Sequence, residues 1–240
     1  MYDILQQILY FFGHGFCHQY TERSLEAGGL YFCVCARCTG IYLGFIVSLT
    51  LVVIMHYRPS STTCSGMPTT WVIVVCAFLI VPMAIDGAGS YLGLFETTNL
   101  ARYITGYLCG MSLAVISSGG ILSLFPRANH RANQSQSAIR TPGRLLVLLL
   151  SSAAGGALFF LGYPSMGIVA PLISLACLWF SVTVVVLLIV STTRLWPTSS
   201  SAPRRLATTA LCLLAALAIM AVFSFAASLL GILFPWYMHP

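Results

Sequence analysis

Lysine is absent from this 240-residue chain, and acidic residues are scarce, since Asp and Glu together number five. Charged residues make up only 7% of the chain, whereas hydrophobic residues make up 58% and the mean hydropathy is +0.92. So few charges exclude a water-soluble domain of this size. The net charge of +6 comes mostly from loop arginines, so it indicates membrane topology and weak attraction to anionic lipid heads, with no nucleic-acid surface.

Long apolar runs predict an all-α, polytopic membrane helix bundle embedded in the lipid bilayer. A spanning helix needs about 20 mostly apolar residues. Six windows fit this length, at 39–56, 70–85, 101–124, 145–162, 168–192 and 206–234. The second window is short, so its end is the least sharply defined. The apolar segment 4–16 is shorter than a span and predicts an N-terminal interfacial or re-entrant helix.

The arginines predict the orientation of the bundle. Short loops rich in arginine stay on the cytoplasmic side. Such loops follow the third and fifth windows and contain Arg127, Arg131, Arg140 and Arg144, then Arg194, Arg204 and Arg205. We therefore expect a multi-pass protein of the cytoplasmic membrane, with the segment 17–38 at the external face. The same pattern divides the chain into a motif-bearing part with three spans (1–125), a basic cytoplasmic loop (126–144) and three further spans (145–240).

Metal-binding side chains gather just before the first apolar window. The spacing of Cys35 and Cys38 lets one turn present two thiolates to a metal ion, as in zinc sites. Cys17 and His18 lie upstream and would complete a tetrahedral Cys3His set. The sequence therefore predicts a zinc site with the ligands Cys17, His18, Cys35 and Cys38.

The same cysteines allow other interpretations. Neighbouring residues seldom both bind one ion, so His14 or Cys33 could substitute for a member of the Cys17-His18 pair. An external location would permit structural disulfides. A Cys-x-x-Cys pair near the bilayer surface also suits an enzyme that passes electrons between thiols and a quinone.

A second polar region leads into the third apolar window. It contains Asp86, Glu96, Asn99 and Arg102. Because a charged side chain at membrane depth normally needs a partner, we expect Asp86 or Glu96 to pair with Arg102 or with Arg37. The spacing of Glu96, Asn99 and Arg102 would place all three on one stripe of a helix that begins near residue 97.

Two pairs of glycines predict how the first and third spans meet. Gly40 and Gly44 lie in the first span, and Gly106 and Gly110 lie in the third. Small residues four apart let helix backbones approach closely. We expect the two helices to pack near their outer ends, which would bring the cysteine segment beside the second polar region.

The ordered series of short motifs resembles domain-of-unknown-function family 2085, a family of small predicted polytopic membrane proteins. It runs through Cys-His-Gln at 17–19, Arg-Ser at 23–24, Cys-x-Arg-Cys-Thr-Gly-x-Tyr at 35–42, Asp-Gly at 86–87 and Glu-x-Thr-Asn-x-x-Arg-x-x-Thr-Gly at 96–106. Ser90 and Thr97 depart from the family pattern, in which Gln and Ser are frequent at these positions. The resemblance implies a membrane location and favours treating the two regions as one site, but it implies no activity.

The leading functional hypothesis is a membrane enzyme with zinc at the external interface, acting on a lipid or lipid-linked substrate. Asp86 or Glu96 would act as general base beside the zinc, with Asn99 in the same cluster, while Arg37 and Arg102 would neutralise a phosphate or carboxylate. Four protein ligands would make the zinc structural, and the chemistry would then belong to the second polar region.

Two further hypotheses are a thiol-disulfide or quinone-linked oxidoreductase, and a non-catalytic membrane scaffold or small-molecule binder. The last three windows contain no Asp, Glu, Lys, Arg or His, which argues against a proton- or ion-coupled transporter. The sequence predicts no oligomeric state.

Overall fold

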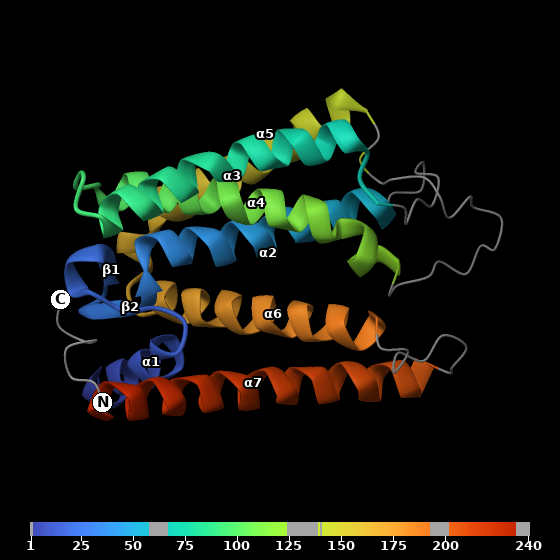
Figure 1. Cartoon of the computed structure of the whole chain (residues 1–240). Helices are drawn as coiled ribbons and strands as arrows, with labels where there is room; N and C mark the ends of the chain where they lie inside the picture. Colours follow the sequence, from blue (N-terminus) through green and yellow to red (C-terminus); the bar gives the residue numbers. More distant parts are fainter. Residues whose placement is uncertain (1, 58–66, 124–138, 140, 193–201, 234–240) are drawn as a thin grey trace. The chain divides into compact units, whose positions relative to one another are not determined.

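The computed structural model describes residues 2–57, 67–123, 139, 141–192 and 202–233. Six of its helices are long and apolar enough to cross a membrane, which confirms the predicted polytopic bundle. In chain order the helices are α2 (Ala36–Tyr57), α3 (Thr70–Tyr91), α4 (Asn99–Ser123), α5 (Pro142–Gly162), α6 (Val169–Thr192) and α7 (Ala202–Leu233). A shorter helix, α1 (Tyr2–His14), precedes them where the short N-terminal helix was predicted (Figure 1).

Helix α3 extends beyond its predicted end at Ile85. The helix continues past Pro82 to Tyr91, so Asp86 lies in its last two turns rather than in a following loop. The helix ends where Gly93 adopts a φ of +68°, a left-handed conformation that glycine enters without a Cβ penalty. The Leu94 N–H then donates to the Gly89 carbonyl at 2.9 Å, which satisfies an orphan carbonyl of the last turn.

Contacts divide the chain into two compact units, one of Met1–Thr39 with Gly162–Pro240 and one of Gly40–Leu161. The second unit holds α3, α4, most of α2 and nearly all of α5. Its apolar core includes Val52 of α2, Val72 of α3, Val115 of α4 and Leu148 of α5, each at most 1% exposed. The predicted division of the chain at the basic loop 126–144 was based on the motifs and the spans, not on contacts within compact units. It stays a prediction.

The predicted packing of the first and third spans is confirmed within the second unit. A Cβ added to Gly40 would collide with the Tyr103 carbonyl of α4, and one added to Gly110 would collide with the Ile41 carbonyl of α2. Bare glycine backbones on both helices therefore allow this close approach. Helix α5 is tied to α4 by the Tyr107 hydroxyl, which donates to the Ser152 carbonyl at 2.7 Å.

The first unit contains a β-hairpin that was not predicted. Strands β1 (Ser24–Ala27) and β2 (Leu30–Cys35) pair antiparallel through the two-residue turn Gly28-Gly29. Both glycines have positive φ, +60° and +74°, as a tight hairpin turn of this kind requires. The hairpin lies beside α1, while α6 and α7 pack side by side (Figure 1).

Side chains from the N-terminal segment bond the backbone of β2. Gln6 of α1 accepts from the Tyr31 N–H at 2.8 Å, and Gln19 donates to the Cys33 carbonyl. Cys17 Sγ accepts from the Cys35 N–H at 3.3 Å. Side chains thus make hydrogen bonds to the backbone of every second residue of the strand, at Tyr31, Cys33 and Cys35. The bonds of Cys17 and Gln19 fix the segment 15–20 against β2.

Several predicted features lie outside the described residues. These are most of the basic loop 126–144, with Arg127, Arg131 and Arg140, and most of the loop after the fifth span, with Arg194. The cytoplasmic placement of both loops stays a prediction.

Candidate metal centre

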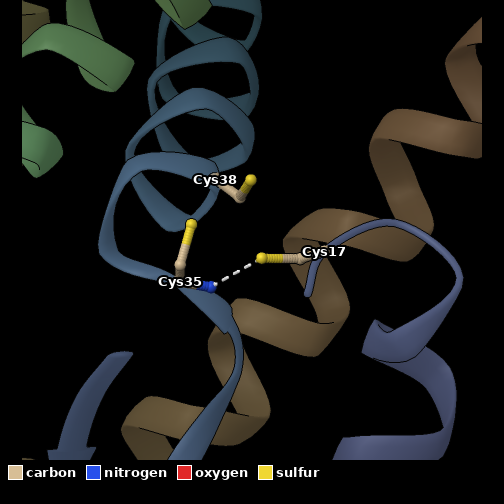
Figure 2. A group of neighbouring side chains, drawn as sticks. All are labelled: Cys17, Cys35 and Cys38. Atoms are coloured by element: carbon tan, nitrogen blue, oxygen red, sulfur yellow. Dashed lines mark hydrogen bonds between the residues drawn. The ribbon is translucent and has the colours of Figure 1, made fainter. Parts of the chain in front are cut away.

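Cys17, Cys35 and Cys38 converge in the first unit. Their sulfur atoms all lie within 4.8 Å of one another (Figure 2). Three thiolates at this spacing could bind a single ion after small side-chain movements, because tetrahedral Zn–S bonds of about 2.3 Å bring the sulfurs to about 3.8 Å from one another. We refer to these three residues as the cysteine cluster.

Three different elements position the cluster. Cys17 lies in the loop after α1, Cys35 is the last residue of β2, and Cys38 lies in the first turn of α2 (Figure 2). The change from strand to helix between Cys35 and Ala36 turns the chain so that both cysteines face one point. Thr39, which is 2% exposed, donates from Oγ1 to the Val34 carbonyl at 3.3 Å and fastens this junction.

The structure departs from the predicted four-ligand set at His18. This side chain is exposed, and its ring stacks on Tyr20 with 6.0 Å between centroids. Among the residues that the structure describes, no histidine, carboxylate or further cysteine joins the three sulfurs. The reason is local, because Cys17 points toward Cys35 and Cys38 whereas the ring of the adjacent His18 lies against Tyr20.

Accessibility separates the cluster from the other described cysteines. Cys17, Cys35 and Cys38 are all partly exposed, whereas the remaining described cysteines are buried. All eight described cysteines are free thiols. The buried ones pack as small apolar side chains. The described cysteines that a ligand could reach are therefore the three that lie together.

Neighbouring groups favour ionisation of one cluster thiol. Hydrogen bonds from the Cys17 and Cys38 thiols lower the pKa of Cys35 well below its ordinary value, helped by the positive charge of Arg37. The same interaction raises the pKa of Cys17, because two neighbouring thiolates would repel each other. Cys33 lies outside the cluster, and burial raises its pKa to about 12. The cluster thus holds one thiolate readily, and a cation would be needed to ionise all three.

The second polar region lies in the second unit, where α3 meets α4. Arg102 is 8% exposed and donates from Nε to Thr97 at 3.0 Å and from Nη1 to Asn99 at 3.3 Å. Asp86 is 5% exposed and accepts a hydrogen bond from Thr105 Oγ1 at 3.2 Å. Asp86, Asn99 and Arg102 are thus held by hydrogen bonds near one end of the α3–α4 pair. An ion pair between an acid and Arg102 stays a prediction.

Glu96 does not share the helical stripe that its spacing predicted. Helix α4 begins at Asn99, because Thr98 Oγ1 accepts from the Ala101 N–H at 3.2 Å and caps the helix. Glu96 lies in the preceding loop and is exposed. The prediction placed the helix start too early, since it did not recognise Thr98 as the cap.

Comparison with known proteins identifies the family. The model of the family described as "Predicted membrane protein (DUF2085)" matches residues 17–116. An uncharacterised protein of Methanothermobacter thermautotrophicus is 33% identical over 101 residues, which cover 42% of this chain and 83% of that relative. The chain belongs to the DUF2085 family.

The chain is similar to a second archaeal protein. An uncharacterised protein of Methanocaldococcus jannaschii is 33% identical over 97 residues, which cover 40% of this chain and 58% of that relative. No solved structure matches the chain. The family match includes the cysteine cluster and the second polar region but ends within α4, so α5, α6 and α7 lie beyond it.

Sequence reasoning missed the residues that position the cluster. Gln19 belongs to the Cys-His-Gln motif, and its Nε2 donates both to Cys33 and to the Tyr10 carbonyl of α1, the latter at 3.0 Å. Its φ of +52° is unusual for a residue other than glycine. Gly13 allows this approach, because a Cβ there would collide with the Cys33 carbonyl. The presence of a polar residue, Gln19, at the third position of the Cys-His-Gln motif was the sequence signal that could have indicated this positioning role.

Proposed function

We propose that this DUF2085 member is a membrane metalloenzyme in which Cys17, Cys35 and Cys38 hold zinc, and that it acts on a lipid or lipid-linked substrate. The observation that carries the proposal is the convergence of the sulfurs of three partly exposed cysteines from three separate elements. Thiolates select soft or borderline ions, of which zinc is the one most often bound by cysteine sets of this kind. Bound zinc would supply Lewis acidity.

The residues around the cluster fit this role. Gln19 and the Cys35 N–H hold the Cys17 loop against β2, so the ligands are positioned before an ion arrives. Arg37 lies between Cys35 and Cys38 in the sequence, in the first turn of α2, and its positive charge helps to lower the pKa of Cys35. We assign Arg37 the task of neutralising an anionic group of the substrate, such as a phosphate or carboxylate.

The second polar region has a proposed role of its own. Asp86 would accept a proton, while Arg102 and Asn99 would orient a polar head group. The support for a functional role of this region is the family match, which includes it together with the cysteine cluster. We also propose that the cysteine cluster faces the outside of the cell, on the arginine pattern alone.

Metal analysis of the full-length protein tests the zinc proposal. The protein is purified in detergent under reducing, chelator-free conditions, and zinc and iron are measured against protein. We expect about one equivalent of zinc in the wild type and less than about a tenth in Cys35→Ser, because a three-thiolate site does not survive the loss of one ligand. Cys33→Ser is the matched control, since Cys33 lies on the same strand outside the cluster and should leave the zinc content unchanged.

The opposite result favours a redox function. Cys35 and Cys38 form a Cys-x-x-Cys pair at the start of a helix, an arrangement found in thiol-disulfide enzymes. Wild-type protein with less than about a tenth of an equivalent of metal would contradict the zinc proposal. Cysteine labelling that then changes with dithiothreitol or a quinone would support an oxidoreductase in its place.

A further inference from the structure

The geometry points to a metal centre with three ligands from the chain and one from outside it, and we propose that the outside ligand is a thiol-bearing molecule. This inference rests on the proposed zinc site and names the chemical group of its substrate that meets the ion. Its starting point is the ligand count, because among the described residues three sulfurs meet within 4.8 Å and no His, Asp, Glu or further Cys side chain joins them. A tetrahedral ion with three protein ligands keeps one position for a substrate.

The surroundings leave room for such a ligand. The three cysteines of the cluster are partly exposed, although the strand that carries Cys35 is otherwise largely buried. The side chain closest in sequence that could close the site is His18, and it is exposed and stacked on Tyr20 instead. A molecule can therefore approach the sulfurs without displacing a described ligand.

Charge and softness favour a thiol over other donors. A divalent ion with three thiolates carries one net negative charge, which the Arg37 guanidinium offsets. A fourth, anionic ligand is then less costly than it would be without Arg37. Thiolates match a sulfur-rich centre best, and four-sulfur zinc sites are common. The incoming thiol would bind through its sulfur as a thiolate, its proton would pass to solvent, and a nucleophilic sulfur would result at neutral pH.

Cobalt substitution provides the test, because tetrahedral Co²⁺ in a sulfur-ligand site has visible absorption that reports its ligands. Full-length protein is loaded with Co²⁺ in detergent, desalted, and titrated with 2-mercaptoethanol, with ethylene glycol and azide as matched probes. We expect the thiol to change the spectrum saturably, with ethylene glycol inert and azide weaker. Arg37→Gln should weaken thiol binding by about tenfold, because a charge-assisted contact is lost, and Arg37→Lys should restore most of it.

Each other outcome is decisive. A cobalt-loaded protein whose spectrum no probe alters would mean that the chain itself supplies the fourth ligand, which would overturn this inference and leave the zinc proposal standing. An equal response to azide and thiol would overturn the thiol assignment. Failure of the wild type to bind Co²⁺ or zinc at all would refute both proposals together.

Discussion

The cysteine cluster and the second polar region differ in how far other side chains provide hydrogen-bond partners for them. Arg102 and Asp86 are buried, and each makes hydrogen bonds to named side chains of the α3–α4 connection or of α4. The cluster cysteines are partly exposed and their sulfurs lie within 4.8 Å of one another, a grouping that costs free energy once more than one thiol is ionised. The contrast indicates that hydrogen bonds within the chain already hold the second region in place, whatever substrate group it also contacts, whereas the role proposed for the cluster requires a cation.

Replacing Arg102 should lower the stability of the folded protein more than replacing Gln19. Arg102→Ala removes the two hydrogen bonds that the guanidinium donates to Thr97 and Asn99, and the loss of hydrogen bonds from a charged donor should cost about 1–3 kcal/mol. For a chain of this size we expect the apparent melting temperature in detergent to fall by roughly 2–10 °C. Scanning fluorimetry measures this, with zinc content determined on the same sample and expected to remain unchanged.

Arg144→Ala is the control for this comparison, since Arg144 is an exposed arginine in the first turn of another span of the same unit. It should change stability by no more than about 0.5 kcal/mol. If Arg102→Ala left the melting temperature unchanged but reduced zinc binding, Arg102 would support the cluster rather than the α3–α4 pair, and the contrast between the two regions would be wrong.

Replacing Gln19 should have a smaller effect that connects stability with metal binding. Gln19→Ala removes hydrogen bonds to the Tyr10 and Cys33 carbonyls and should cost about 1–2 kcal/mol. Because Gln19 holds the loop that carries Cys17, zinc should bind several-fold more weakly while the stoichiometry at saturation is retained. Competition with a zinc-sensitive dye gives the affinity.

Gln7→Ala is the matched variant, since Gln7 is an exposed glutamine of α1. It should behave as wild type in both measurements. Zinc affinities that do not differ between the two glutamine variants would show that Gln19 has no positioning role in the cluster.

The spans were predictable because hydrophobicity over about 20 residues is a strong, local signal. The α2–α4 contact was predictable for a similar reason, since glycines four apart leave few alternatives to close packing. The hairpin was not predicted, because β1 has only four residues and lies among polar motif residues. Gly28-Gly29 between Leu25 and Leu30 was the signal that could have revealed it.

The ligand set was predictable only in part. The Cys35 and Cys38 spacing is local, so one strand-to-helix turn brings the two together wherever the rest of the chain lies. The third ligand depended on how the 15–20 loop meets β2, which Gln19 and the Cys35 N–H determine through contacts distant in sequence. Nothing in the adjacent pair Cys17-His18 indicated which of the two would turn toward the cluster.

X-ray absorption at the zinc edge tests the central claim most directly. On full-length protein purified without added thiol, the account predicts three sulfur neighbours at about 2.3 Å and one lighter donor, with a fourth sulfur appearing when 2-mercaptoethanol is added. A shell of nitrogen and oxygen alone, or protein that binds no zinc, would contradict it.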